Sequence, residues 1–409
     1  MGAECFLIAT VDQTGFPFSS RMSSIELEVS VVIPCLNEAD TVGVCVRQAM
    51  DALVRHDIAG EVIVVDNGST DDSCERAVEA GARLLSVPER GYGHALMGGI
   101  AAARGTCIIM GDADGSYDFS TLHRFVAQIR AGYDLVQGCR FPRGGGQIES
   151  GSMPFVHRWV GNPALTQLAR CMFGTRLHDI YCGLRGFTRS FYNRANLRCT
   201  GMEFATEMII KAAQLGVRTA EVPITLSRDG RNGRPSHLRT FRDGWRTLRL
   251  FLLCSPNWLF LIPGIALVVS GLSGSMLGLV AGRIGPAILG VHTLLVSCLF
   301  LLVGTQSCFL GIFAHTFAMV EGLRPSSAAL MAFYRLFNLE KALLCASIIA
   351  LVGLALIAVV YFDWRRGGYG PLDYSRTLRF VGPGVTLLAL AAQTVFSSFM
   401  VSFLGLDRK

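Results

Sequence analysis

Charged residues are scarce in this sequence of 409 residues. Asp, Glu, Lys and Arg together make up 17% of the chain, whereas hydrophobic residues make up 51% and the mean hydropathy is +0.43. Disordered and fibrous proteins are excluded, because neither class carries this much apolar material. The formal net charge of +6 is modest for this length, so the sequence predicts no nucleic-acid partner.

Paired cysteines are also missing. The 13 cysteines include no C-x-x-C pair, which excludes a small disulfide scaffold and argues against a structural zinc site. They are expected to be small buried side chains in a reducing compartment. The sequence has no G-x-S-x-G elbow and no G-x-x-x-x-G-K-[ST] loop, so neither a hydrolase triad nor a P-loop is supported.

The few charges are unevenly distributed, and residues 250–409 hold only 10 basic and 5 acidic residues. Four uncharged apolar stretches in this half reach the roughly 20 residues that a membrane-spanning helix needs. They cover residues 258–282, 287–314, 342–361 and 380–404. We therefore expect a multi-pass membrane domain of about four helices over residues 256–409. The alternative, buried helices of a large soluble core, is disfavoured by four such stretches in one chain.

The residues that precede the first apolar stretch are basic. Seven arginines lie between Arg228 and Arg249, which favours placing the preceding domain on the cytoplasmic side. Arginines in the loop 362–379 weaken this signal. Residues 236–255 place Arg239, Arg242, Arg246 and Arg249 on one helical face, beside a stripe that includes Phe241 and Trp245. This pattern predicts an amphipathic helix on the membrane surface, with an ordinary solvated helix as the alternative.

The first half alternates short apolar runs with helical stretches. Residues 29–34, 62–66, 107–112 and 135–139 have strand character, and residues 38–55 and 71–80 have helical character. This alternation predicts an α/β domain with a mostly parallel sheet over residues 29–235. The preceding residues, 1–28, are expected to form a flexible segment.

Polar residues follow the predicted strands, at the sheet edge where ligands of such domains bind. Asp112 and Asp114 flank one small residue directly after a buried strand, and two such carboxylates can share a divalent cation. In isolation this pattern is weak, because loop carboxylates are usually solvated. The glycine-rich run 91–99 predicts tight packing or close approach to a ligand in a loop that enters a helix.

Several motifs in one order resemble the family 2 glycosyltransferases, which have the GT-A fold. The motifs are VVIPCLNE at residues 31–38, VIVVDNGSTDD at 62–72 and GDAD at 111–114. Four later motifs resemble the polyprenyl-phosphate branch, which includes dolichyl-phosphate and undecaprenyl-phosphate sugar synthases. These are LVQGCR at residues 135–140, HRWVGN at 157–162, DIYCGLRGF at 179–187 and GMEFATE at 201–207. The resemblance covers about residues 29–250.

The resemblance implies a role for each matching residue. Pro34, Asn37, Glu38 and Asp66 would line the nucleotide pocket, and Asp112 and Asp114 would hold Mg²⁺ or Mn²⁺ beneath the diphosphate. Arg140 would face a phosphate, Arg158 would receive the acceptor phosphate, and Arg231, Arg234 and Ser236 would close over the diphosphate. For each arginine, a surface ion pair is the alternative. Asp179 and Glu207 are candidate active-site carboxylates, and neither is assigned as a base.

The implied activity is inverting transfer of a hexose from a nucleotide sugar to a polyprenyl phosphate at a membrane. A processive polysaccharide synthase is the first alternative, although the Q-x-x-R-W motif of those enzymes is absent. The second is a catalytically inactive membrane scaffold of the same fold, which the intact carboxylate series disfavours. The apolar spans could anchor the enzyme, assemble a homo-oligomer or guide the lipid, and the sequence does not separate these roles.

Overall fold

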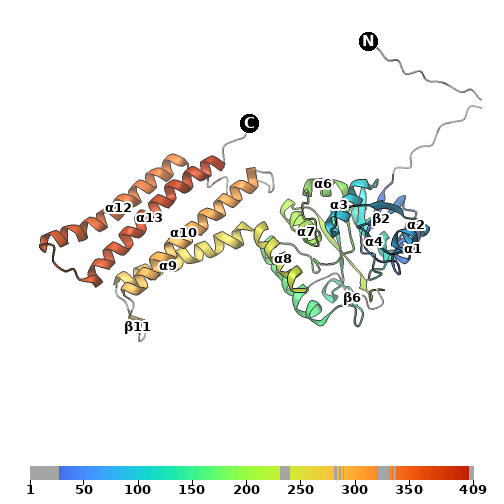
Figure 1. Ribbon diagram of the computed structural model, residues 1–409, viewed down its shortest axis with the longest axis horizontal. Helices are drawn as coiled ribbons and strands as arrows, with labels where there is room; N and C mark the ends of the chain where they lie inside the picture. Colours follow the sequence, from blue (N-terminus) through green and yellow to red (C-terminus); the bar gives the residue numbers. More distant parts are fainter. Residues whose placement is uncertain are drawn as a thin grey trace, which may run out of the picture.

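The computed structural model describes residues 27–230, 240–280, 283–284, 287–288, 290–320, 332, 334 and 338–404. Residues 1–26 of the segment expected to be flexible lie outside this described part. The described residues form an α/β domain followed by a set of long apolar helices (Figure 1).

The α/β domain is built on a seven-stranded sheet with the order β3-β2-β1-β4-β7-β5-β8. β7 runs antiparallel to its neighbours β4 and β5, whereas the other pairs are parallel. The strands are β1 (Val29–Cys35), β2 (Gly60–Asp66), β3 (Arg83–Ser86), β4 (Cys107–Met110), β5 (Leu135–Cys139), β7 (Arg185–Thr188) and β8 (Thr219–Pro223). A separate ribbon pairs β6 (Gln147–Ile148) with β9 (Thr225–Leu226). The predicted fold class, a mostly parallel α/β domain followed by apolar helices, is confirmed.

Helices cover both faces of the sheet, which explains the continuous apolar strands. On β1, Val31 and Ile33 join one core cluster, while Val32 between them joins the other. The first face packs against α1 (Val42–Arg55), α2 (Ser73–Glu79) and α4 (Leu122–Arg130). The second packs against α3 (Tyr92–Ala102), α5 (Asn162–Phe173), α6 (Arg189–Ala195) and α7 (Glu203–Leu215). Three short helical segments, η1 (Phe119–Thr121), η2 (Pro142–Gly144) and η3 (His157–Gly161), complete the domain.

The helix α8 (Thr240–Cys254) lies between the α/β domain and the apolar helices (Figure 1). Its Phe251 is fully buried and meets Phe173 of α5 edge to face, with ring centroids 5.5 Å apart. Its Phe241, by contrast, is 92% exposed. The described part of the predicted amphipathic segment is therefore helical and anchored to the domain along one side.

Within the described part of the chain, four helical segments are long and apolar enough to cross a membrane: Asn257–Leu279, Val291–Val320, Leu339–Arg366 and Tyr374–Leu404. They correspond to η4 (Asn257–Leu261) with α9 (Ile262–Val280), α10 (Val291–Val320), α12 (Leu339–Arg366) and α13 (Tyr374–Leu404). Their backbones approach closely, since a Cβ atom on Gly304 of α10 would lie 2.8 Å from the Gly264 carbonyl oxygen of α9. The second helix begins at Val291 rather than 287, because β10 (Arg283–Ile284) pairs with β11 (Ala287–Ile288) in a two-stranded ribbon.

Candidate active site

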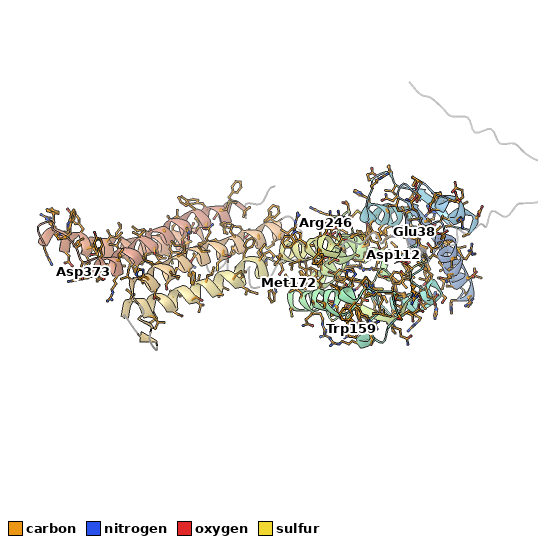
Figure 2. All side chains as sticks on the ribbon, turned by 60° about the horizontal axis from the view of Figure 1, so that its bottom comes forward. Glu38, Asp112, Trp159, Met172, Arg246 and Asp373 are labelled. Carbon is orange, nitrogen blue, oxygen red and sulfur yellow. The ribbon has the colours of Figure 1, made fainter. Side chains whose placement is uncertain are left out.

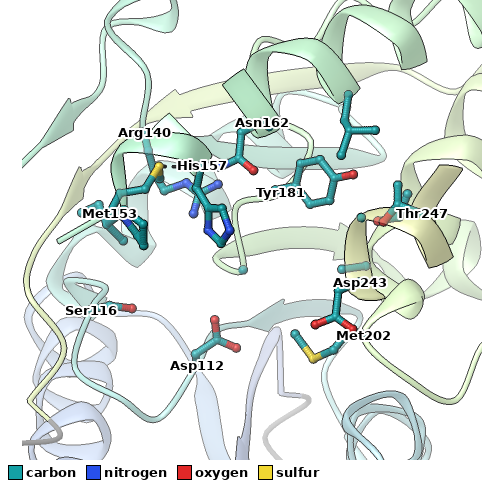
Figure 3. Close-up of a pocket in the computed structure, with 18 of the residues that line it drawn as sticks. Asp112, Ser116, Arg140, Met153, His157, Asn162, Tyr181, Met202, Asp243 and Thr247 are labelled. Atoms are coloured by element: carbon teal, nitrogen blue, oxygen red, sulfur yellow. Dashed lines mark hydrogen bonds between the residues drawn. The ribbon is translucent and has the colours of Figure 1, made fainter. Parts of the chain in front are cut away.

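Two cavities open beyond the carboxyl ends of the central strands. A smaller cavity of about 380 Å³ is lined by Pro34 at the end of β1, by Glu38 after it, and by Asn67 after β2. A larger one of about 560 Å³ is lined by Arg140, after β5, and by His157 of η3. Five residues line both: Tyr92, Asp112, Asp114, Met202 and Arg246. The two predicted carboxylates therefore stand where two cavities meet. Figure 3 shows Asp112 among the residues that line the larger one.

The Asp112 carboxylate is held between the Tyr92 hydroxyl and the backbone at Gly183. The Tyr92 hydroxyl donates a 2.9 Å hydrogen bond to Oδ1 of Asp112. The other oxygen, Oδ2, packs against Gly183, where a Cβ atom would lie only 2.3 Å from it. Gly183 is itself fixed, because its N–H donates to the Tyr117 hydroxyl at 2.9 Å. Position 183 of the motif DIYCGLRGF must therefore be glycine, because a larger side chain would displace the Asp112 carboxylate.

Asp114 is oriented by the turn that follows it. Oδ1 of Asp114 accepts hydrogen bonds from the Ser116 backbone N–H at 3.0 Å and from the Ser116 hydroxyl at 2.6 Å. Gly115 permits this turn because its φ is +75°. Ser116 therefore acts on Asp114 directly and lines the larger cavity beside it.

The two carboxylates fit a hard divalent cation that is shared with a substrate. Among the described residues, no group of three His, Cys, Asp or Glu side chains forms a complete metal-binding cluster. Mg²⁺ usually takes one or two carboxylates and completes its shell with water and phosphate oxygens. Asp112 and Asp114 supply that minimal set at a point open to both cavities.

Asn37 and Asp66 were predicted to line the nucleotide pocket, but they line neither cavity. Asn37 accepts a 2.8 Å hydrogen bond from the Thr70 N–H, and Asp66 accepts from Ser69 and Gly68 at 2.9 and 3.2 Å. Burial would raise the pKa of Asp66, but these hydrogen bonds outweigh it and hold the pKa below its ordinary value. Both side chains brace the loop after β2, beside the smaller cavity.

Arg140 reaches the larger cavity from within a buried ion pair. Its guanidinium donates to both oxygens of Asp179, at 2.7 and 2.9 Å, and the two residues are 7% and 0% exposed. Burial alone would lower the pKa of Arg140, but the charge of Asp179 raises it well above the ordinary value. Asp179, one of the candidate carboxylates, is thus the partner of Arg140.

The remaining predicted residues either are absent from the cavity linings or lie outside the described part. Arg158 of η3 stacks on Trp159, with its guanidinium carbon 5.4 Å from the ring centroid, and lines neither cavity. Glu207 accepts from the backbone N–H groups of Arg198 and Cys199 at 2.9 and 2.8 Å. Arg231, Arg234 and Ser236 lie outside the described residues.

The cavity-lining residues that were not predicted include Tyr92, His157 and Arg246. The glycine-rich run 91–99 contained the signal for Tyr92, since a Cβ atom on Gly93 would lie 2.5 Å from the Cys199 carbonyl oxygen. The Gly91 N–H also donates a 2.7 Å hydrogen bond to the Asn67 side chain. Together these contacts direct the Tyr92 side chain toward Asp112. His157 opens the motif HRWVGN, although no role was assigned to it, and it enters the larger cavity from η3 (Figure 3).

Replacing Gly183 by alanine is expected to lower catalytic activity by about 100-fold, the scale of a displacement of about 1 Å in an active site. The new methyl group would lie where Oδ2 of Asp112 now packs. Turnover with saturating substrates measures the loss. Gly43→Ala on α1 is the control, because its methyl group would meet the mobile end of the Arg47 side chain at 3.3 Å. Equal activity of both variants would contradict the proposed position of Asp112.

Comparison with known proteins identifies both halves of the chain. Residues 30–194 match the family described as glycosyl transferase family 2, and residues 312–405 match the glycosyltransferase family 2 C-terminal transmembrane region. Together with the four apolar helices, this makes the chain an integral membrane protein.

Three similar proteins illustrate the match. The low-salt glycan biosynthesis hexosyltransferase Agl6 of Haloferax volcanii is 34% identical over 391 residues, which cover 94% of this chain and 91% of that protein. The dolichyl-phosphate hexose transferase of the same organism is 32% identical, over 48% of this chain and 82% of that protein. Among solved structures, glucosyl-3-phosphoglycerate synthase from Mycobacterium tuberculosis is 25% identical over 56% of this chain and 78% of that chain, with a TM-score of 0.43. The full-length match to a family member, with the two family regions in order, shows that the chain belongs to glycosyltransferase family 2 and is a glycosyltransferase.

Proposed function

We propose that this enzyme transfers one hexose from a nucleotide sugar to a polyprenyl phosphate at the membrane surface, with inversion at the anomeric carbon. The observation that carries the proposal is the meeting of two cavities at Asp112 and Asp114. A water-soluble donor and a lipid acceptor need separate entrances and one common reaction centre. The relatives support this acceptor class, since one is named a dolichyl-phosphate hexose transferase. Another, 28% identical, is an undecaprenyl-phosphate 4-deoxy-4-formamido-L-arabinose transferase of Klebsiella pneumoniae.

The smaller cavity is the proposed donor site. Pro34 and Glu38 line it, and Asn37 and Asp66 hold the adjoining loop after β2. In this position, the Asp66 carboxylate would accept a hydrogen bond from the edge of the nucleotide base. Asp112 and Asp114 would hold Mg²⁺ or Mn²⁺, which when bound offsets the charge of the diphosphate leaving group. The proposed loop arginines Arg231 and Arg234, with Ser236, would close over that diphosphate.

The larger cavity is the proposed acceptor site. An ionised phosphate oxygen attacks the anomeric carbon and forms the new C–O bond. The bond from that carbon to the diphosphate breaks, and its electron pair leaves with the nucleoside diphosphate. No general base is required, because the nucleophile is already an anion. The chain contributes position and compensating charge: Arg140 lines the cavity wall, and Arg158 of η3, which is not part of that lining, would receive the acceptor phosphate at the membrane surface.

Exposed aromatic side chains support a position against the bilayer. Trp159 of η3 and Trp245 of α8 are 63% and 60% exposed, and both elements also line the larger cavity. Figure 2 shows Trp159 at the edge of the domain in that view. Aromatic rings of this kind sit well at a membrane interface. The larger cavity would then open where the acceptor phosphate lies.

In this arrangement, residues 29–235 form the catalytic domain, 236–255 the interfacial helix and 256–409 the multi-pass membrane domain. The arginines before the first span favour a cytoplasmic catalytic domain. The membrane helices would anchor the enzyme, and their close packing could also serve a homo-oligomer.

A panel of labelled nucleotide sugars tests the function. Membranes that contain the full chain are incubated with each sugar and with undecaprenyl or dolichyl phosphate, and the lipid fraction is analysed. One sugar on one lipid phosphate is the expected product. A long polymer would instead indicate a processive polysaccharide synthase, and absence of any metal-dependent transfer or hydrolysis would indicate an inactive scaffold.

A further inference from the structure

The helix α8 has exposed aromatic side chains on one side and active-site residues on the other. Phe241 and Trp245 are exposed, whereas Thr247 and Phe251 are buried at 6% and 0% exposure. On its inner side, Asp243, Arg246 and Thr247 line the larger cavity (Figure 3 shows Asp243 and Thr247). The helix is therefore part of the site wall as well as a surface element.

Among the described residues, Arg246 is the one positively charged side chain that lines both cavities. Of the five residues that line both cavities, two are the carboxylates Asp112 and Asp114, and Arg246 is the one cation among those described. Figure 2 shows Arg246 on the side of the domain toward the membrane helices. From the sequence, Arg246 was grouped with Arg242 and Arg249 on one basic face. The structure separates it from them, because neither of the other two lines either cavity.

The side chain of Arg246 is held loosely. Its nearest described carboxylate is Glu203 of α7, with a nitrogen–oxygen distance of 3.5 Å, and the two side chains are 44% and 20% exposed. Strong charge-assisted hydrogen bonds are about 2.7–2.9 Å long, so this pair is weak enough for a phosphate to compete with it. Arg140, by contrast, is committed to both oxygens of Asp179. Arg246 is thus the cation available to a substrate where the cavities meet.

We propose that Arg246 binds phosphate oxygens of both substrates at the junction of the two cavities. The inference rests on the proposed function, in which an anionic phosphate approaches a carbon that carries a diphosphate. These two anions repel one another, and a guanidinium between them lowers that repulsion as they converge. A planar guanidinium can donate to two oxygens at once, which an ammonium group does less well. Because Arg246 sits on α8, the helix at the membrane brings this charge to the lipid phosphate.

The test compares three variants of the full chain in detergent: Arg246→Gln, Arg246→Lys and the matched control Arg249→Gln. Arg249 is exposed on the same helix, carries the same charge and lines neither cavity. Transfer by Arg246→Gln is expected to fall by about 100-fold in kcat, the scale for loss of one preorganised donor. Arg246→Lys keeps the positive charge but lacks the planar guanidinium that donates to two oxygens, so its kcat should fall by about tenfold. Arg249→Gln should stay within about twofold of the unchanged protein, as an exposed charge away from the site does.

Binding gives a readout that does not need the sugar. Undecaprenyl phosphate, and UDP or GDP with Mn²⁺, are titrated against each variant by calorimetry. Arg246→Gln should weaken binding of undecaprenyl phosphate, and of the nucleotide that binds the unchanged protein, by about tenfold each, the scale of one charge-assisted contact. If the unchanged protein transfers no sugar, the proposed function fails, while the binding series still decides the role of Arg246. Binding and turnover by Arg246→Gln within twofold of the unchanged protein, or equal losses in Arg249→Gln, would overturn the inference.

Discussion

Replacing Asp112 or Asp114 by asparagine is expected to lower sugar transfer at least about 1,000-fold, because a cation that offsets transition-state charge supplies several kcal/mol. Both carboxylates line both cavities, and each is held by a specific hydrogen bond, from Tyr92 or from Ser116. Asparagine keeps the shape and these hydrogen bonds but removes the charge. The loss should therefore appear without a fall in the amount of protein in the membrane.

Asp118 provides a matched control in the same loop. Its Oδ1 accepts from the Ser120 N–H at 2.9 Å, where it caps η1, and it lines neither cavity. Asparagine caps helices as well as aspartate does, so Asp118→Asn should retain nearly full transfer. Binding of Mn²⁺ in the presence of UDP or GDP, followed by electron paramagnetic resonance, gives a second measurement. Full transfer by either of the two cavity variants would rule out a cation at this pair.

Much of the α/β domain is predictable from the sequence, because its strands are buried on both faces. The run that became β1 (Val29–Cys35) is apolar at nearly every position, and β5 (Leu135–Cys139) begins and ends where expected. The antiparallel strand β7 (Arg185–Thr188) was not predicted, since the four residues RGFT show neither alternation nor an apolar run. Its place between β4 and β5 is decided by tertiary packing.

The candidate site was predictable where residues follow strands directly. Pro34, Glu38, Asp112 and Asp114 stand at strand ends, and the parallel sheet brings those ends together. Arg246 could not be assigned in this way, because helical periodicity groups side chains by angle and not by what the helix packs against. The burial of Phe251 against α5 fixes the rotation of α8, and that rotation turns Arg246 toward the cavities.

The membrane helices were located from composition, and their ends were not. The fourth helix extends through the described residues to Leu404, and it begins at Tyr374, within a stretch that was expected to be a loop. Polar residues extend the helix beyond the apolar run, since Asp373 caps it by accepting from the Ser375 N–H at 2.8 Å. The hydropathy of the sequence locates the residues that cross the apolar layer of the membrane, whereas the capping residue determines where the helix begins.

Removing the Asp179 carboxylate is expected to destabilise the catalytic domain by about 3–5 kcal/mol, because Arg140 would be left as a buried, uncompensated charge. Asp179 accepts from the Arg140 guanidinium at 2.7 and 2.9 Å and from the Tyr181 N–H at 3.1 Å, and it is fully buried. For Asp179→Ala, the midpoint of thermal unfolding of the full chain in detergent should fall by roughly 6–20 °C. Arg194→Gln breaks the more exposed pair with Asp134, at 3.4 Å, and should cost less than about 1 kcal/mol.

A double variant separates the ion pair from simple loss of packing. If the cost of Asp179→Ala comes from the stranded guanidinium, adding Arg140→Met should recover part of the stability, since removal of both partners leaves no buried charge. The midpoint of the double variant should therefore lie above that of Asp179→Ala. A lower midpoint would mean that Asp179 acts mainly through its backbone contacts near Tyr181. Transfer should remain low in the double variant in either case, because Arg140 lines the acceptor cavity and its charge is gone.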